Sequence, residues 1–283
     1  MMAERLADIA TQIQNVRQLE AVVTAMRGIA ASRAQRGRSL LAGIEAYHAV
    51  ISRAIGQALT MLGAPVMDPS RAHGRTALVL FCAEQGFAGA FSEHLFEHAA
   101  AELANALTFV VGTRGEIVAR ERGLSPSWTA AMATHVDAIP SLANRIADAL
   151  YQHIAAATIS KIEIVVSRST AGGGIQIERR SLLPLDLSRF PQPGNRLPPL
   201  TTLPPHDLLE RLTAEYVYAQ LCDAAMHAYV TENQARMMTM TAAKSNIGDK
   251  LNTLSQRERQ LRQEEITSEI IELASGTEAL RRR

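Results

Sequence analysis

Cysteine, aromatic residues and net charge are all scarce in this sequence. The two cysteines, Cys82 and Cys222, lie far apart and carry no flanking motif, which argues against a disulfide framework and a metal knuckle. Only 4% of the 283 residues are aromatic, although 47% are hydrophobic, so slender helix packing is favoured over a thick core. The formal net charge is +1. A dedicated nucleic-acid-binding protein would be strongly basic. The nearly neutral composition therefore argues against nucleic-acid binding as the main function.

Long apolar runs and phosphate-binding motifs are missing as well. No stretch approaches the roughly 20 apolar residues that cross a bilayer, and the charged start MMAERLADIATQIQ is not expected to act as a secretory signal. The sequence has no G-x-x-x-x-G-K-[ST] motif. We therefore expect a soluble chain, which can still attach to a membrane complex through partners.

The C-terminal segment, residues 208–280, has no proline and only two glycines, Gly248 and Gly276. Apolar side chains recur there mostly three and four residues apart, the period of a helical stripe. A helix of this length would extend on the order of 100 Å, which is more than a domain of this size can cover. We therefore expect it to project and to need a partner helix.

The N-terminal segment provides that partner. It reads as helical over residues 3–59, and its four glycines mark points where bends or close contacts are expected. The same three-four spacing joins its apolar residues, which are Leu6, Ile9, Ile13, Val16, Leu19, Val23, Met26 and Ala30. The two ends of the chain are therefore predicted to pair as a long antiparallel coiled coil.

Between the two ends, strands and helices alternate. Buried strands are expected at residues 76–82, 108–112 and 162–167, with a further edge strand at residues 174–183. Helices are expected at residues 92–103, with Ser92 as the N-cap, and at residues 116–122 and 140–157. This order predicts a small Rossmann-like α/β domain with helices on both faces of its sheet.

Proline and glycine mark the domain boundaries. Residues 63–74 read as a linker, and seven of the eleven prolines fall within residues 184–205, which excludes a helix or an internal strand there. The predicted organisation follows from these breaks: an N-terminal helix at 1–62, an α/β domain at 75–183, a proline-rich crossover at 184–206 and a C-terminal helix at 207–283.

Three candidate sites arise from the residues alone. The turn at residues 86–89 follows a strand and precedes a helix, but its G-F-A-G order and the adjacent Glu84 are poor matches to a phosphate site. His94 and His98 have the spacing of a metal pair without a third ligand, so an exposed polar face is favoured. The basic run at residues 27–38 is either a contact surface or a solvated face. We predict no catalytic, cofactor-binding or metal site.

Several segments are closely similar to one known family. The run ENQARMMTMTAAKSN at residues 232–246, RQEEITSEI at 262–270 and ELASG at 272–276 resemble the end of the gamma subunit of the rotary F-type ATP synthase. TAMRGIAAS at residues 24–32 resembles its first helix, and a looser likeness includes EQGFAGA at 84–90 and LLPL at 182–185. The resemblance spans essentially the whole chain. Departures around residues 27–33 and 84–88 indicate a divergent branch, such as an alternative bacterial ATPase beside a housekeeping one.

This resemblance implies a mechanical function. In that family the paired terminal helices form a central shaft inside a ring of three alpha and three beta subunits, while the α/β domain lies against the epsilon subunit and the c-ring. Ion-driven rotation of the shaft opens and closes the catalytic beta subunits in turn. The chain is accordingly expected to be a non-catalytic rotor subunit, peripheral to the cytoplasmic face of a bacterial inner membrane, with no nucleic-acid partner.

The resemblance also implies which residues contact the beta-subunit loops. Those positions are Met26, Arg236, Arg262, Gln263 and Thr267. The alternative from another functional class is a nucleotide- or metabolite-binding enzyme that uses the coiled coil for dimerisation, and a third is a basic adaptor on nucleic acid. The first needs a phosphate fingerprint and the second a basic charge, and the sequence has neither.

Overall fold

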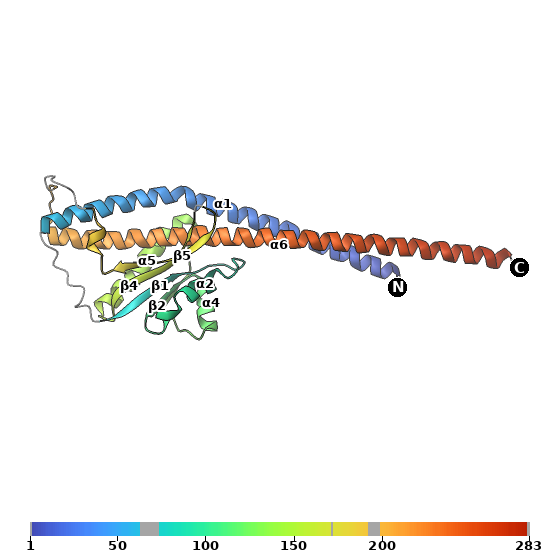
Figure 1. Cartoon of the computed structure of the whole chain (residues 1–283), viewed down its shortest axis with the longest axis horizontal. Coiled ribbons are helices and arrows are strands. Elements are labelled where there is room, and N and C mark those ends of the chain that lie inside the picture. The colour runs from blue at the N-terminus through green and yellow to red at the C-terminus, as the bar shows by residue number, and fades with distance from the viewer. Residues whose placement is uncertain (1, 63–73, 171, 192–198, 282–283) are drawn as a thin grey trace. The chain divides into compact units, whose positions relative to one another are not determined.

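A computed structural model describes residues 2–62, 74–170, 172–191 and 199–281. Its longest elements are helices α1, Met2–Leu62, and α6, Pro205–Arg281 (Figure 1). By internal contacts the chain divides into two compact units, one of residues 1–29 with 237–283 and one of residues 30–236. We call these the helix-pair unit and the α/β unit. Both long helices contribute to both units.

The α/β unit contains a five-stranded sheet in the order β3-β2-β1-β4-β5, as far as the described residues extend. Neighbouring strands from β3 to β4 are parallel, and β5 at the edge pairs with β4 in the antiparallel sense. The strands are β1 Arg75–Phe81, β2 Leu107–Val111, β3 Trp128–Ala130, β4 Ile159–Ser169 and β5 Ile175–Leu183. Parallel strands bury both faces, which explains their nearly continuous apolar sequences.

Alternate residues of β1 enter two separate cores. Val79 packs with side chains of α5, Ile139–Ala155, and of α6, whereas Leu80 packs with α2, Phe91–His98, and α4, Thr113–Glu121. Two short helical elements, α3 Ala100–Leu103 and η2 Val136–Ala138, complete this part, and η3, Leu187–Arg189, lies in the crossover. Each fully buried Val, Leu, Ile or Phe contributes about 1.5–3 kcal/mol. Helices therefore cover both faces, as predicted.

Helix α1 passes through all four of its glycines without a break. A Cβ at Gly37 would lie 2.5 Å from Cγ2 of Val230, and one at Gly56 would overlap the carbonyl oxygen of Pro191. At Gly28 and Gly43 an added Cβ would meet nothing within 4 Å. Close contacts therefore explain why glycine occupies positions 37 and 56. The helix continues through all four glycines, so none of them marks a break.

Several local expectations need correction. Ser92 is not the N-cap of α2, because the cap position is Ala90, and the Ser92 hydroxyl instead accepts the N–H of Ala83 at 3.2 Å. The helix expected at residues 92–103 is divided into α2 and α3. Strand β3 was not predicted, since it has only three residues and none is fully buried. Most of the expected linker, residues 63–73, lies outside the described residues, as do residues 192–198 of the crossover.

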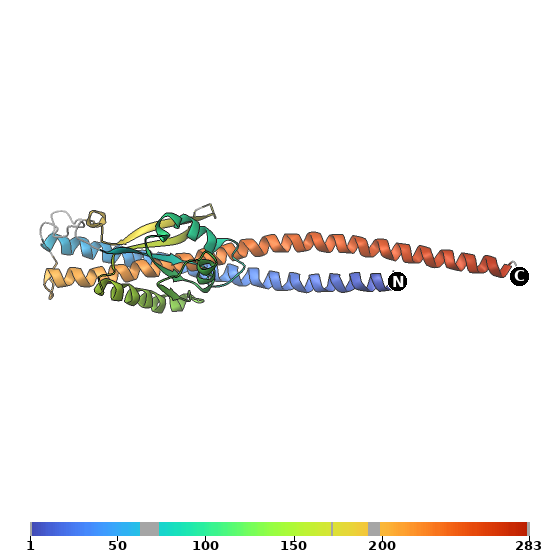
Figure 2. The same ribbon diagram turned by 90° about the horizontal axis from the view of Figure 1, so that it is seen from below.

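The helix-pair unit consists of two helical segments that run in opposite directions (Figure 2). Val23, Met240 and Ile247 are buried in its seam, and the half-buried residues around them are Val16, Met26, Ala243 and Leu251. These positions follow the predicted three-four spacing, so the two terminal segments pair through their apolar stripes. Leu19, which was also expected in the stripe, is instead 52% exposed. The division at 1–62, 75–183, 184–206 and 207–283 follows elements rather than packing units and stays a prediction.

Candidate functional site

Arg236, one of the predicted contact residues, is buried in the α/β unit with only 5% of its surface exposed. Its Nε donates to the carbonyl oxygen of Gly86 at 3.1 Å, and its Nη2 donates to that of Gln85 at 3.0 Å. The same Nη2 lies 2.5 Å from a carboxylate oxygen of Glu232, which also accepts the N–H of Gln85. Arg236 and Glu232 therefore hold the turn after β1 against α6.

That turn has an unusual backbone. Phe87 and Gly89 both have a φ of 63°, and the Phe87 side chain is 65% exposed. A left-handed conformation is unfavourable for a bulky residue, so neighbouring contacts must hold it in place. The two carbonyls fixed by Arg236 directly precede Phe87 and supply such contacts. The glycine turn is thus part of the connection between the sheet and the C-terminal helix.

Met26 lies in the helix-pair unit and is half-buried against the seam of Val23, Met240 and Ile247. Part of its flexible thioether side chain remains accessible, and methionine adapts readily to irregular surfaces. The structure therefore leaves Met26 able to pack within the seam and to meet a partner. Contact with a beta-subunit loop stays a prediction.

The other three predicted residues are neighbours on α6 within the helix-pair unit. Arg262, Gln263 and Thr267 are all exposed, and the Thr267 hydroxyl donates to the carbonyl oxygen of Gln263 at 2.8 Å. The exposed Arg262 forms an ion pair with the half-buried Glu258 at 3.1 Å, on the surface of the helix. Exposed pairs of this kind contribute about 0–1 kcal/mol, so Arg262 can exchange its partner at little cost.

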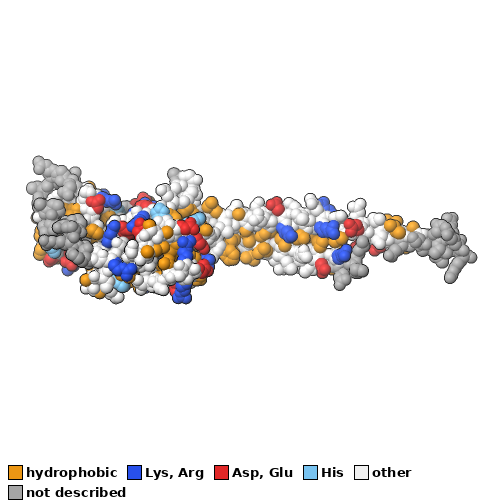
Figure 3. Space-filling model, turned by 60° about the horizontal axis from the view of Figure 1, so that its bottom comes forward, with side chains coloured by type: hydrophobic (Ala, Val, Ile, Leu, Met, Phe, Trp, Pro, Cys, Tyr) orange, Lys and Arg blue, Asp and Glu red, His pale blue; other side chains and the backbone are white. Residues whose placement is uncertain are grey.

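Apolar residues also remain exposed on the helix-pair unit. The large apolar side chains that are more than half exposed there are Leu19, Val22, Ile29, Met238, Ile266, Ile270, Ile271 and Leu273. Figure 3 shows hydrophobic side chains among polar ones along the helical surface. An apolar surface of this kind on a helix pair is suited to a surrounding partner rather than to water.

The carboxyl edge of the sheet is occupied by Glu84. Its carboxylate accepts the N–H and hydroxyl of Thr113, at 3.0 and 2.8 Å, and the N–H of Met132 at 2.7 Å. These donors include the first backbone N–H of α4, a helix N-terminus that could otherwise bind an anion. A carboxylate there both fills the site and repels phosphate. This geometry disfavours the nucleotide-binding alternative.

The remaining candidate clusters have ordinary surroundings. His94 and His98 are exposed on α2, next to Glu93 and Glu97, which pair with Arg114 and Arg122 at 3.5 Å. Across the ranges that the structure describes, no group of three or more His, Cys, Asp or Glu side chains could hold a metal ion. Cys82 is buried and Cys222 is half-buried, and both are free thiols.

The basic run at residues 27–38 is partly used within the chain. In the α/β unit Arg36 lies 3.6 Å from Asp137, and Arg38 donates to Gln234 at 2.9 Å. The Arg36 pair is mostly exposed and therefore weak. This part of the run is better described as a set of internal surface contacts than as a single basic patch.

Sequence reasoning missed a buried polar network between α6 and the β4–β5 edge. Asp223 lies 2.9 Å from Arg180 and 3.4 Å from His227, and Arg168 lies 2.6 Å from Nε2 of His227. Burial by itself would raise the pKa of Asp223, but the hydrogen bond from His227 and the charge of Arg180 lower this pKa to about 2. Asp223 is therefore the fixed negative charge that connects the sheet edge to α6.

Among the described residues, no helix has an apolar stretch long enough to span a bilayer.

Comparisons with known proteins point to one family. The family model described as ATP synthase matches residues 5–280. The ATP synthase gamma chain of Streptomyces griseus is 29% identical, covering 99% of this chain and 97% of the relative. That of Streptomyces avermitilis is 27% identical with the same coverage.

A solved structure shows the same fold. In the mitochondrial ATP synthase of Euglena gracilis, from a structure of its OSCP, F1 and c-ring parts, a chain matches with a TM-score of 0.67 and 10% identity. The match covers 98% of this chain and 95% of the Euglena chain. Since the family model extends over nearly the whole sequence, the chain belongs to the ATP synthase family, and the curated relatives named above are its gamma chains.

Proposed function

We propose that this chain is the central rotor subunit of an F-type ATP synthase. In this role it couples rotation of an ion-driven membrane ring to the opening and closing of catalytic beta subunits. The observation that carries the proposal is the antiparallel helix pair, whose buried seam contains Val23, Met240 and Ile247, in a chain that matches the family over residues 5–280. Interdigitated side chains give such a pair the torsional stiffness that a shaft requires.

The exposed surface of the helix-pair unit supports this role. Half-exposed apolar residues such as Ile266 and Ile270 provide a smooth surface within a surrounding ring. Arg262, Gln263 and Thr267 provide the polar contacts on the same helix, and Met26 provides an apolar contact on α1. In our proposal these residues meet the beta-subunit loops once per turn.

Arg236 has a different role in this proposal. Its donors are directed at Gln85, Gly86 and Glu232 within the chain, so its main contribution is to fix the turn before Phe87. Because Arg236 is only 5% exposed, any contact with a beta subunit would involve the small accessible part of its side chain. The exposed Phe87 is the side chain that this fixed turn presents to a partner.

Catalysis belongs to other subunits in this account. Glu84 accepts the first N–H of α4 and so occupies a helix N-terminus that could otherwise bind an anion, and a rotor needs no active site of its own. We therefore propose a non-catalytic role without a cofactor. The α/β unit would contact the epsilon subunit and the c-ring, and the complex would keep the chain peripheral to the cytoplasmic face of a bacterial membrane.

Reconstitution tests this function. The chain is mixed with alpha and beta subunits from the same genome, and complexes are isolated by size-exclusion chromatography. We expect one copy of this chain with three copies each of alpha and beta, and Mg-ATP hydrolysis that depends on its presence. Failure to co-elute with alpha and beta, while both fold and bind one another, would contradict the proposal.

A further inference from the structure

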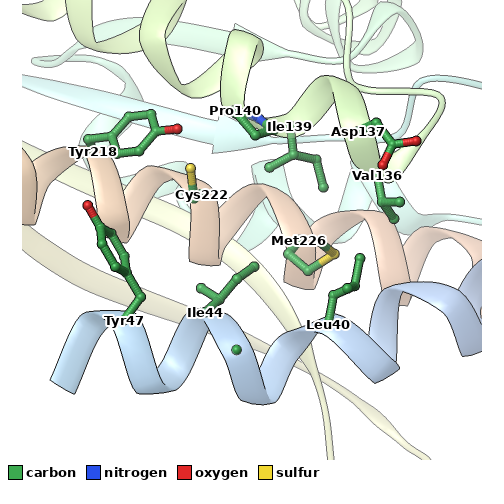
Figure 4. Close-up of a pocket in the computed structure, with 11 residues that line it drawn as sticks. Leu40, Ile44, Tyr47, Val136, Asp137, Ile139, Pro140, Tyr218, Cys222 and Met226 are labelled. Atoms are coloured by element: carbon green, nitrogen blue, oxygen red, sulfur yellow. The ribbon is translucent and has the colours of Figure 1, made fainter. Parts of the chain in front are cut away.

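A groove in the α/β unit lies between three helical elements. It has a volume of about 550 Å³. Figure 4 shows α1 along one side, α6 along a second side, and the η2–α5 segment along the third. Its lining residues are Leu40, Gly43, Ile44 and Tyr47 from α1, Val136, Asp137, Ile139 and Pro140 from η2 and α5, and Tyr218, Cys222 and Met226 from α6.

The wall of the groove is mainly apolar. Leu40, Ile44 and Met226 form its middle part, with the two tyrosines toward one end and Asp137 toward the other (Figure 4). The Tyr47 hydroxyl already donates to Glu215. Asp137 is the only charged side chain among the described residues that line the groove, and its contact with Arg36 at 3.6 Å is exposed.

The dimensions favour a small molecule over a protein segment. Small-molecule sites have volumes of about 300–1,000 Å³ and combine apolar walls with few polar groups, and this groove meets both conditions. The groove extends along α1 from Leu40 to Tyr47, about 10 Å, which is the least that a docked helix with anchors over two turns would need.

The charge of the wall restricts the ligand further. No cation occurs among the described lining residues, and Arg36, outside the wall, already lies 3.6 Å from Asp137, so a carboxylate or sulfonate on the ligand would meet the negative charge of Asp137 without a lining cation to pair with. We propose that the groove between α1, α5 and α6 binds a neutral or singly cationic aromatic molecule of about two to three rings. Its rings would pack on Leu40, Ile44 and Met226, with any positive group toward Asp137. This site is independent of the rotor function.

A matched pair of probes tests the charge selectivity. N-phenylnaphthylamine and anilinonaphthalene sulfonate share their ring system and differ in the sulfonate, and both fluoresce on entering apolar sites. With the purified full-length chain, we expect the neutral probe to bind several-fold more tightly. Asp137→Asn should bring the two affinities closer, by about fivefold or less because Asp137 is exposed. Tighter binding of the sulfonate by the unmodified chain would overturn the assignment of ligand charge.

A filling variant tests the location of the site. Gly43 lines the groove, and an added Cβ there meets nothing within 4 Å, so Gly43→Leu should fold and occupy the groove. Gly28 on the same helix is equally open and lies outside the groove, so Gly28→Leu is the control. We expect the affinity for N-phenylnaphthylamine to fall at least tenfold in the first variant and to stay unchanged in the second. Equal affinities in both variants would overturn the site.

The two cysteines give a test that needs no substitution. Cys222 lines the groove, whereas Cys82 is buried in another core, so N-ethylmaleimide labelling of each can be followed by mass spectrometry. Burial raises the pKa of the Cys222 thiol, and labelling is therefore carried out at mildly alkaline pH. Saturating N-phenylnaphthylamine should slow labelling of Cys222 at least threefold without changing that of Cys82. An unchanged Cys222 rate would overturn the proposal.

Discussion

The guanidinium of Arg236 on α6 donates to the carbonyl oxygen of Gln85, 151 positions earlier in the chain, at 3.0 Å. Together with Glu232, Arg236 holds the turn after β1 against α6, the long C-terminal helix. A torque that acts on the α/β unit would therefore reach α6 through a buried, charge-assisted contact rather than through a flexible loop. Such hydrogen bonds are stronger than neutral ones.

Arg236→Ala should destabilise the α/β unit strongly. The substitution removes the cationic partner of the buried Glu232 carboxylate and the Arg236 donors to two carbonyl oxygens, and the loss of one partner of a buried pair costs about 3–5 kcal/mol. Urea unfolding followed by tryptophan fluorescence measures the effect, since Trp128 lies in β3 of this unit. Arg262→Ala is the control, because its exposed pair with Glu258 should change the free energy of unfolding by less than about 1 kcal/mol. Equal effects of both substitutions would contradict the structural role of Arg236.

Asp223 should make the α/β unit sensitive to acid. Its folded-state pKa of about 2 lies below the usual value of 3.8, so its contribution is present above pH 4 and is lost as the pH falls toward 2. The loss is on the order of 2 kcal/mol. The free energy of unfolding of the parent and of Asp223→Asn should therefore converge over this pH range. A constant difference between them from pH 7 to pH 2 would show that Asp223 is not held ionised by Arg180 and His227.

The glycines of α1 should respond in opposite directions to alanine. Gly43→Ala adds a methyl group in open space and should stabilise the helix by about 0.5–1 kcal/mol. Gly56→Ala forces a methyl group onto the Pro191 carbonyl oxygen, and we expect a loss of about 1–3 kcal/mol, as for an overpacked core. Thermal unfolding of the two variants beside the parent measures both effects. Stabilisation by both substitutions would mean that α1 and Pro191 are not in close contact.

The coupling contacts should affect turnover without affecting assembly. Arg262 and Gln263 are exposed on α6, and a contact that forms and breaks on every turn suits charge-assisted hydrogen bonds of about 1.5–3 kcal/mol. Arg262→Ala combined with Gln263→Ala should lower the ATPase turnover of the reconstituted complex by about threefold to tenfold. Arg257→Ala, at an exposed position earlier on the same helix, is the matched control. Wild-type turnover in a fully assembled double variant would contradict the assignment of these two residues.

Much of the fold follows directly from local sequence patterns. Strands β1, β2 and β4 are apolar runs because both faces of a parallel sheet are buried, and their predicted positions agree with the structure to within a few residues at each end. Helices α1 and α6 follow from a three-four apolar period that persists through glycines. Strand β3 has three residues with no fully buried side chain, so it has no such pattern and depends on pairing with β2.

The contacts between distant segments could not be predicted in the same way. Ser92 has the properties of an N-cap residue, but its hydroxyl oxygen instead accepts a hydrogen bond from the N–H of Ala83. The family resemblance predicts Arg236 as a contact with a beta subunit, which stays a prediction, and it does not show that the donors of Arg236 are directed at Gln85 and Gly86. The network around Asp223 likewise joins α6 to β4 and β5, and nothing in the local sequence of either segment indicates the other.

Single-molecule rotation tests the central claim most directly. The reconstituted complex is fixed to a surface through its beta subunits, and a gold particle is attached to an exposed site on the α/β unit of this chain. On addition of Mg-ATP the account predicts stepwise rotation in one direction, with three resting positions per turn that correspond to the three beta subunits. A particle that stays fixed while the same complexes hydrolyse ATP would contradict the assignment of this chain as the rotor.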